Sequence, residues 1–369
     1  MSGSFWKIRR ELIRLGNQLL EPYRQVRDAL LRVDYRFRHA HHVQHFEGKV
    51  GWTERVAVFL VHQPQGVAHS VFLTCDHLNE QGYSCVLVSN GEIRLEDLKL
   101  LLPKVAHVIL RPNFGYDFGG YQEAVIWLRQ CGVDVKQLLL LNDSVWFPVL
   151  KGASLLTEME KTGADVVGAL SAQRGAAQRH QRKLFFASFM LLFSDKVWRS
   201  AKFKNFWENY RQTSSKPRTI RMGERKLSAL FIHDDEFTHH AMVDANKYRG
   251  LSLGLTPSTW PRFAGELGLM DASFDQQRKT LLMRSGPDVL EEWRDWYQRL
   301  CESQNMFTCA QASLVSREGV PFIKKSKDRH NMQVLEQSLE VFRLEPLFDA
   351  VVLQEMEAQV DQYFQSLRT

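Results

Sequence analysis

The chain has 369 residues, of which 44% are hydrophobic and 24% charged, and its formal net charge is +6 at pH 7. This composition is ordinary for a globular protein, and the length suits one large domain with additions or two domains. No apolar run reaches the ~18 residues of a membrane-spanning helix, and the five scattered cysteines, which lack metal-site spacing, indicate reduced thiols in a cytosolic protein.

The first 45 residues are basic, with nine lysines and arginines against four acidic residues, which accounts for +5 of the net charge. Hydrophobic residues recur there at helical spacing, and the arginines lie off this stripe of Phe5, Ile8, Leu12, Leu15 and Leu19. Two interpretations stay open: a helix on an anionic membrane surface, or a helix that packs on its own protein. We expect no secretory signal and no nucleic-acid partner.

Apolar runs alternate with helical patterns between residues 54 and 143. The expected strands are 54–63, 83–91, 105–112 and 135–143. Because helical stretches separate them, the pattern predicts an α/β fold with a mostly parallel sheet and helices on both faces. In such a sheet, ligands bind at the carboxyl ends of the strands.

The second half of the chain is expected to become increasingly helical. Residues 164–173 and 183–193 are predicted strands, 194–212 a helix capped by Ser194, 211–226 a mobile loop, and 234–250 a helix. Beyond residue 270 the chain is largely helical. We therefore divide it into a basic amphipathic segment (1–50), a main domain (51–328) and a helical tail (329–369).

The loop that opens with "RPNFGYDFGG" follows the third strand. Glycines 115, 119 and 120 allow backbone to approach a ligand, and the helix that begins near Asp117 offers free amides to a diphosphate. Arg111 adds a charge with fork geometry for phosphate oxygens. The alternative is a tight strand-to-helix turn with Asp117 as its cap.

The fourth strand ends abruptly in the polar residues Asn142, Asp143 and Ser144. A carboxylate at a strand tip is a hard oxygen ligand suited to Mg²⁺ or Mn²⁺, which usually complete their shell with substrate phosphates. The alternative is an Asx-type turn.

The stretch "IHDDEFTHH" holds three carboxylates and three histidines within nine residues, 232–240. On a helix, Asp235 would share a face with His239, and Glu236 with His240. Three interpretations stay open: a two-metal hydrolase, a general base for a hydroxyl nucleophile, and an acid-rich helix start.

These stretches together resemble the rhamnan synthesis protein F family, bacterial glycosyltransferases of surface polysaccharides. The similarity spans roughly residues 54 to 326. The family's first motif is matched by Arg111, Asn113, Gly115, Tyr116, Asp117, Phe118, Gly119 and Tyr121. Its later motifs are matched by Leu141, Asn142, Asp143 and Ser144, by Glu236 with Tyr248, and by Pro321, Phe322, Ile323 and Lys324.

The resemblance implies a GT-A-like fold, a nucleoside-diphosphate sugar donor (dTDP-rhamnose first) and a growing lipopolysaccharide, O-antigen or capsule-type acceptor, lipid-linked or oligosaccharide. It implies a Mg²⁺ or Mn²⁺ ion at Asp143, a catalytic base at Glu236 or Asp235, and transfer with inversion. Donor-binding residues would be Arg111, Asn113, Gly115, Tyr116, Asp117, Asn142 and Ser144. The expected location is cytoplasmic, with peripheral contact at the inner face of the cytoplasmic membrane.

The sequence departs from the family pattern at two places near these motifs. Phe147 precedes Pro148 where the family tends to have glycine, and Ala187 stands where a glutamine is expected. A second hypothesis therefore stays open: a non-catalytic glycan-binding or scaffold protein on a degenerate transferase fold.

Overall fold

The computed structural model describes residues 22–23, 26–30, 33, 42–174, 183–269, 271–284, 286, 288–326 and 328–367. The hydrophobic stripe expected between residues 5 and 19 lies outside the described residues. Among those that are described, no helix is long and apolar enough to cross a membrane.

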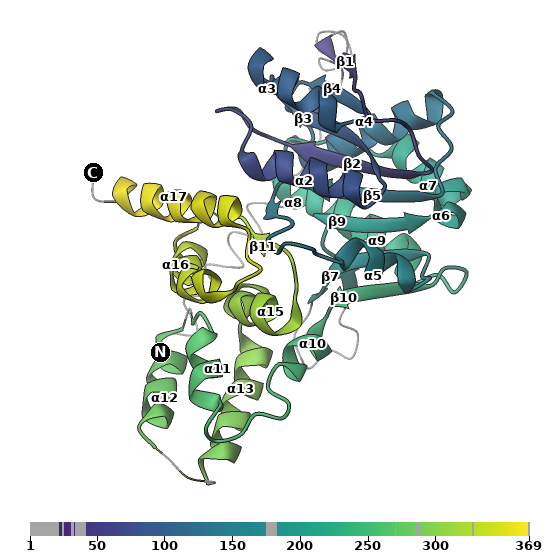
Figure 1. Ribbon diagram of the computed structural model, residues 1–369. Coiled ribbons are helices and arrows are strands. Elements are labelled where there is room, and N and C mark those ends of the chain that lie inside the picture. Colours follow the sequence, from purple (N-terminus) through teal and green to yellow (C-terminus); the bar gives the residue numbers. More distant parts are fainter. Residues whose placement is uncertain are drawn as a thin grey trace.

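The described residues form a nine-stranded sheet in the order β1-β4-β3-β2-β5-β9-β7-β10, with β8 paired to β7 (Figure 1). The strands are β1 (Gln44–Glu47), β2 (Arg55–Val61), β3 (Ser84–Asn90), β4 (His107–Arg111), β5 (Gln137–Asn142), β7 (Val166–Arg174), β8 (Lys183–Phe186), β9 (Met190–Ser194) and β10 (His239–Val243). The neighbours β4, β3, β2 and β5 are parallel, and β7 and β10 point the same way because only the antiparallel β9 separates β7 from β5. The mostly parallel sheet predicted from the sequence is confirmed.

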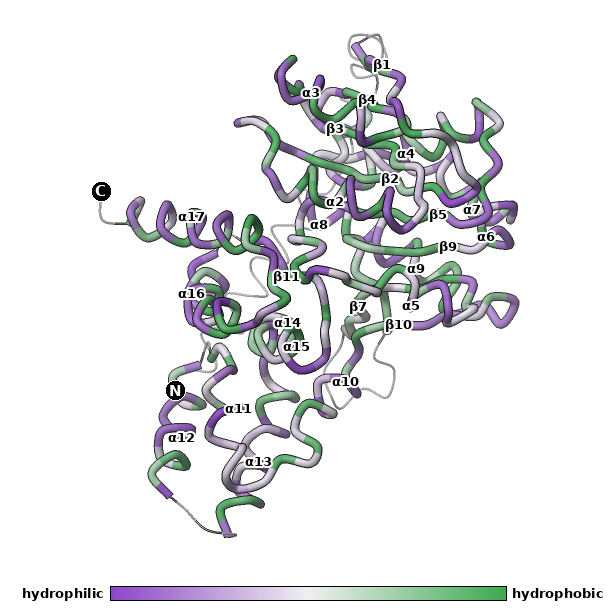
Figure 2. Tube along the Cα trace, in the orientation of Figure 1, coloured by the Kyte–Doolittle hydropathy of each residue, from purple (hydrophilic) through white to green (hydrophobic). Residues whose placement is uncertain are grey.

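Helices cover both faces of the sheet because strand side chains alternate between two cores. On β2, Ala57 and Phe59 join one core and Val58 and Leu60 the other. The first face is covered by α2 (His69–Glu80), α3 (Leu95–Leu101) with the 3-10 turn η3 (Leu102–Lys104), and α5 (Leu155–Lys161). The second is covered by α4 (Tyr116–Gln130), α6 (Asp195–Arg199), α7 (Ala201–Asn209) and α9 (Arg225–Ile232). In Figure 2 the central strands are correspondingly among the most hydrophobic segments.

The chain beyond β10 is largely helical, as expected beyond residue 270; the described residues of 245–303 extend away from the sheet, and the last two helices return beside it (Figure 1). Its helices are α10 (Ala245–Gly250), α11 (Trp260–Glu266), α12 (Ala272–Leu282), α13 (Val289–Ser303), α14 (Met306–Cys309), α15 (Gln311–Glu318), α16 (Arg329–Leu344) and α17 (Ala350–Ser366). The short strand β11 (Ile323–Lys324) returns to pair with β6 (Val145–Trp146).

The last two helices bury a third core against residues that follow β5. This core includes Trp146 and Val149 together with Leu335 and Val352. Glu355 on α17 accepts hydrogen bonds from the amide of Ser70, at 2.7 Å, and from Nε1 of Trp146, at 3.2 Å. The tail therefore packs directly on the main domain, and the boundaries after residues 50 and 328 stay predictions.

Three local predictions were wrong. The strand expected over 183–193 is split into β8 and β9 by residues 187–189, and the helix expected over 234–250 is a turn, the edge strand β10 and the short α10. The expected mobile loop 211–226 is largely helical: α8 (Lys216–Thr219), the π-helical turn η4 (Ile220–Glu224) and α9 form one continuous rod.

The rod forms because one of its faces is buried at a spacing of four residues. This face consists of Thr219, Gly223, Leu227 and Phe231. A Cβ atom at Gly223 would lie 2.6 Å from the ring of Phe118, so the rod packs more closely on α4 than any larger residue would permit. The basic residues on the other face concealed this thin apolar stripe in the sequence.

Candidate active site

A cavity of about 640 Å³ lies at the carboxyl ends of the parallel strands, where the sequence placed the ligand site. Residues from the tips of β2, β3 and β5 line it, together with the loop after β4, the break between β8 and β9, the rod 216–232 and Lys324. Of the predicted site residues, the structure brings together Asn113, Tyr116, Asp117, Asn142, Asp143 and Ser144.

The tip of β5 is held rigidly by its own side chains. Oδ1 of Asn142 accepts hydrogen bonds from the amide of Ser144, at 3.1 Å, and from its hydroxyl group, at 2.5 Å. The amide of Asp143 donates to the carbonyl of Leu60 at 3.0 Å. These bonds leave the Asp143 side chain facing the tip of β2.

The carboxylate of Asp143 is oriented by β2, and the two hydrogen bonds that the described residues make to it both fall on Oδ2. The amide of His62 donates at 2.9 Å, and Nε2 of Gln63 donates at 2.6 Å. This leaves Oδ1 for a cation. The described residues contain no group of three or more His, Cys, Asp or Glu placed to hold a metal ion. One free carboxylate oxygen can supply only a single ligand to a Mg²⁺ or Mn²⁺ ion, whose other ligands would have to come from a bound diphosphate, so an ion at Asp143 stays a prediction.

Arg111 lies beneath the glycine-containing loop rather than in the cavity. Its side chain is buried, with 1% of the residue exposed, and it donates to Oδ1 of Asn90 at 2.5 Å and to Oε1 of Gln212 at 3.2 Å. Nε of Arg111 lies 3.8 Å from a carboxylate oxygen of Glu123. The predicted direct contact of Arg111 with donor phosphates is therefore corrected: Arg111 supports the loop.

The glycines of this loop serve packing rather than ligand approach. Gly115 has φ +87°, a left-handed conformation that favours glycine, and it begins α4 without lining the cavity. A Cβ atom on Gly119 would lie 2.3 Å from the carbonyl oxygen of Phe114, and one on Gly120 would lie 2.3 Å from the side chain of Leu60. The donor-binding role predicted for Gly115 is thus indirect, because the residue shapes the turn that presents Tyr116 and Asp117.

Two carboxylates on the cavity wall share one serine. The hydroxyl group of Ser188 lies 2.9 Å from Oδ2 of Asp117 and 2.9 Å from Oε2 of Glu224. Burial raises the pKa of Asp117, and burial together with the charge of Asp117 raises the pKa of Glu224. A raised pKa strengthens a carboxylate as a proton acceptor, so Asp117 and Glu224 are both candidates for a general base, and Glu224 is the one carried by the rod.

Glu224 also lies in an unusual element. It ends the π-helical turn η4, and π-turns inserted between α-helical segments occur frequently at functional sites. Lys216, Ile220 and Glu224 of the rod line the cavity together with Thr219 of the buried stripe, while Gly223, Leu227 and Phe231 pack on the protein core.

A lysine from the far end of the sequence completes the cavity. The β6–β11 pairing sets Lys324 opposite Val145, and Nζ of Lys324 donates to the hydroxyl group of Ser144 at 2.8 Å. Burial lowers the pKa of Lys324, an effect that nearby Asp117 and Glu224 oppose. With Lys216, it supplies positive charge to the cavity wall beside the β5 tip.

Asp235 and Glu236 do not lie at this cavity. They are exposed in the turn before β10, near the amino ends of β7 and β5. The carbonyl of Glu236 accepts a hydrogen bond from Lys196 of α6. Because β5 has six residues and each advances ~3.3 Å, roughly 17 Å of strand separates this edge from Asp143. The prediction that either carboxylate is the base opposite the diphosphate is wrong in this geometry.

The hydrolase interpretation of residues 232–240 also fails. These residues form a turn and an edge strand, so the shared helical faces on which that interpretation depended do not exist. All nine are described, and they contribute to no group of three or more ligands placed to hold a metal ion within the described residues.

Several cavity residues are not predicted as site residues by the sequence, among them Ser188, Lys216, Glu224 and Lys324. Ser188 and Glu224 lie in stretches whose sequence predicts one strand and one loop, and Lys324 belongs to a family motif without a predicted site role. The break in the apolar run 183–193, where the polar Ser188 interrupts a strand, was the one local signal.

Comparison with known proteins finds a family match over just under half of the chain. Residues 85–262 match the model of the rhamnan synthesis protein F family. The matched stretch contains the loop after β4, the β5 tip, Ser188 and Glu224. The resemblance drawn from the motifs is therefore confirmed, and the family match supports a role in glycosyl transfer and polysaccharide biosynthesis.

The uncharacterized protein y4gN of Sinorhizobium fredii is 32% identical over 186 residues, which are 50% of this chain and 48% of that protein. The chain thus spans about half the length of this relative. Among solved structures, the glycosyltransferase GlyE of Streptococcus pneumoniae has a TM-score of 0.36 and 13% identity, covering 85% of this chain and 64% of GlyE. TarS of S. aureus has a TM-score of 0.31 and 10% identity, covering 84% and 54%. Such low TM-scores carry no statement about activity.

Proposed function

We propose that the protein transfers a sugar from a nucleoside-diphosphate donor to a hydroxyl group of a glycan acceptor. One observation carries this proposal: motif residues of the rhamnan synthesis protein F family converge on one cavity at the carboxyl ends of parallel strands. Parallel α/β sheets bind their ligands at that edge.

The donor diphosphate would lie against the β5 tip. There Lys324 and Lys216 attract its negative charge, and Asn113, Tyr116 and Asn142 offer hydrogen-bonding groups to the nucleotide and sugar. Asp143 would hold a Mg²⁺ or Mn²⁺ ion through Oδ1. When bound, such a metal stabilises the charge that develops on the departing diphosphate.

The acceptor hydroxyl would be deprotonated by Glu224. Burial raises its pKa, which makes it a better proton acceptor than an exposed carboxylate, and Ser188 fixes its orientation through a hydrogen bond. Attack by this hydroxyl from the side opposite the departing diphosphate would give single displacement with inversion at the anomeric carbon.

At the finer level, we propose a deoxysugar donor of the dTDP-rhamnose type and a lipopolysaccharide, O-antigen or capsule-type glycan as the acceptor, lipid-linked or as an oligosaccharide. The family name motivates the choice of sugar. The expected site of action is the cytoplasm, at the inner face of the cytoplasmic membrane.

A donor screen tests the proposal. The melting temperature is measured with a panel of nucleotide sugars, with and without Mn²⁺, and each stabilising donor is then incubated with glycan acceptors while released nucleoside diphosphate is quantified. A donor-specific rise and nucleotide release are expected. Stabilisation by glycans alone, with no donor effect and no release, would support the non-catalytic glycan-binding alternative instead.

A further inference from the structure

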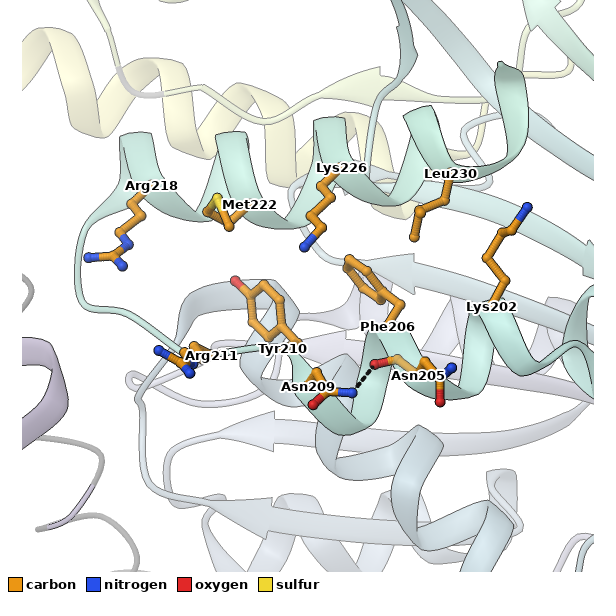
Figure 3. Close-up of a pocket in the computed structure, with 10 residues that line it drawn as sticks. All are labelled: Lys202, Asn205, Phe206, Asn209, Tyr210, Arg211, Arg218, Met222, Lys226 and Leu230. Carbon is orange, nitrogen blue, oxygen red and sulfur yellow. Dashed lines mark hydrogen bonds between the residues drawn. The ribbon is translucent and has the colours of Figure 1, made fainter. Parts of the chain in front are cut away.

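A second hollow, of about 680 Å³, lies on the outer side of the rod 216–232, away from the active-site cavity. Figure 3 shows its two walls: α7 with the residues that follow it, and the rod. We call it the basic groove. The rod residues that line it recur at intervals of four, namely Arg218, Met222, Lys226 and Leu230. At ~1.5 Å per residue they run ~18 Å along the rod.

The groove has an apolar floor and a cationic rim. Phe206 and Tyr210 from α7 and its C-terminal end face Met222 and Leu230 across it (Figure 3). The lining also contains four basic side chains and no carboxylate: Lys202, Arg211, Arg218 and Lys226. Such a lining fits a ligand with one negatively charged group and one apolar group.

The net positive charge of the segment around the groove exceeds the net charge of the whole chain. Residues 199–226 hold nine lysines and arginines against two glutamates, a net charge of +7, while the full chain has +6. Two of the groove cations have acidic partners outside the lining: Lys202 pairs with Asp234, and Arg218 lies 3.7 Å from Asp28. Within the described part of the chain, Arg211 and Lys226 have no such partner.

We infer that the basic groove docks the protein on an anionic lipid surface, with a lipid phosphate at the cationic rim and the upper acyl chain on the apolar floor. Met222 is 37% exposed, and it lies between Arg218 and Lys226 on the rod. Apolar contact combined with cations is the pattern by which proteins bind anionic membranes. This inference does not depend on the proposed transfer reaction.

Vesicle cosedimentation with the full chain tests the inference. The parent is mixed with vesicles of phosphatidylglycerol and phosphatidylcholine, and separately with phosphatidylcholine alone. Binding is expected only to the anionic vesicles, and it should weaken with salt because exposed charges are screened.

The groove variant is Arg211→Glu combined with Lys226→Glu, both on exposed residues outside the proposed catalytic machinery. Because each basic residue near an anionic surface contributes roughly fivefold, the variant should partition ~30-fold less or weaker still. Lys99→Glu with Lys151→Glu changes the charge equally at exposed sites elsewhere, and it should bind within about twofold of the parent. Unchanged near-ultraviolet circular dichroism verifies the fold of each variant.

Four results would overturn the inference. Equal partitioning of the parent and the groove variant would assign any binding to residues 1–45. Equal losses of binding in the two double variants would indicate that binding depends on the overall positive charge of the protein and not on the groove. Inorganic phosphate that raises the melting temperature and displaces the vesicles would indicate a site for a soluble anion. A changed oligomeric mass of the groove variant in sedimentation, without a change in vesicle binding, would make the groove an interface between copies.

Discussion

The hydroxyl group of Ser188 has one hydrogen but two carboxylate neighbours, Asp117 and Glu224. It can therefore donate to only one of them at a time. The other carboxylate lacks this hydrogen bond, so its ionised form is less stabilised. Because burial raises the pKa of both groups, the pair holds a proton more readily than two exposed carboxylates do. The pKa of a general base at this position therefore depends on its neighbours.

The first residue-scale prediction concerns Glu224. Glu224→Gln should lower kcat by ~10²–10⁴-fold while donor affinity changes little, because only proton transfer is lost. In the parent, activity should fall as the pH falls through the raised pKa of Glu224, since the base must be deprotonated. Steady-state kinetics over a pH series measures both effects.

The same substitution has a stability signature. A carboxylic acid whose pKa is raised by folding binds more protons in the folded state, so it lowers stability as the pH rises through that range. Glu224→Gln should therefore flatten this decline in chemical denaturation. Glu236→Gln and Asp235→Asn are the controls, and both should retain near-normal turnover. A large loss of turnover in either control variant, with no loss in Glu224→Gln, would assign the general base to Asp235 or Glu236 at the opposite edge of the sheet.

The second prediction concerns Asp143. Asp143→Asn should abolish the part of donor binding that depends on Mg²⁺ or Mn²⁺ and leave the melting temperature nearly unchanged, because the residue lies at a strand tip. Calorimetric titration of donor with and without metal measures this effect. Equal metal-dependent binding by parent and variant would remove the ligand role from Asp143.

The third prediction concerns His77 on α2, whose ring packs edge-on against Phe147 at 5.3 Å. Burial lowers the pKa of His77 from 6.5 to about 4. The unfolded chain therefore takes up a proton first as the pH falls below 6.5, and stability is lost down to about pH 4. The loss between pH 7 and pH 5 should be ~1–2 kcal/mol. Urea unfolding of the parent and of His77→Gln tests this, because the variant should lack this part of the slope.

At the scale of elements, the rod 216–232 separates two hollows with different linings. One side presents Lys216, Ile220 and Glu224 to the active-site cavity, and the other presents Arg218, Met222 and Lys226 to the basic groove. The rod keeps both sides in place through its close contact with α4.

The fourth prediction tests that contact. Gly223→Ala places a methyl group 2.6 Å from the Phe118 ring, and such overpacking costs ~1–3 kcal/mol, which exceeds the ~0.5–1 kcal/mol that alanine gains in a helix. Gly265→Ala in α11 is the matched control, because a Cβ atom there has no neighbour within 4 Å. Thermal unfolding should show destabilisation at residue 223 and a small stabilisation at residue 265. The same sign at both positions would contradict the close packing.

The elements that local sequence could predict are those with a strong period and clear ends. The parallel strands of the first half are apolar runs bounded by signals such as Asn90-Gly91, and their order along the chain fixes where their tips meet. The rod escaped prediction because its buried stripe contains a threonine and a glycine. Strand β10 escaped because His239 and His240 lie on an exposed sheet edge, where apolar residues are not needed.

The residues of the candidate site likewise fall into those that local sequence could place and those that it could not. Asn113 and Asp143 follow strand ends within two residues, and Asp117 lies in the first turn of the helix after β4, so the sequence could place them at one edge. Ser188, Glu224 and Lys324 reach the cavity only through tertiary packing, since each belongs to an element whose position depends on distant residues.

At the scale of the whole molecule, the tail is held on the main domain by the third core, by backbone hydrogen bonds such as Asp349 N–H to the carbonyl of Val149 at 2.9 Å, and by the carboxylate of Glu355. The fifth prediction is that Glu355→Ala leaves the Ser70 amide and the Trp146 indole nitrogen without this acceptor and costs ~1–3 kcal/mol. Glu357→Ala removes only a partly exposed ion pair with Arg343, which is worth ~0–1 kcal/mol. Equilibrium unfolding of the two variants compares them, and equal small losses would show that α17 is weakly docked.

The pairing of β6 with β11 has a consequence for how the protein is made. Ser144 and Lys324 are 180 positions apart, so the cavity wall that they share cannot close until both have left the ribosome. At roughly 5–20 residues per second, synthesis of the intervening chain takes ~10–40 s. During that interval the sheet can form while its charged edge is incomplete. Nascent chains should therefore acquire affinity for the donor only after residue 324 has emerged. The time at which the protein can first bind its donor then depends on the rate of translation as well as on the rate of folding.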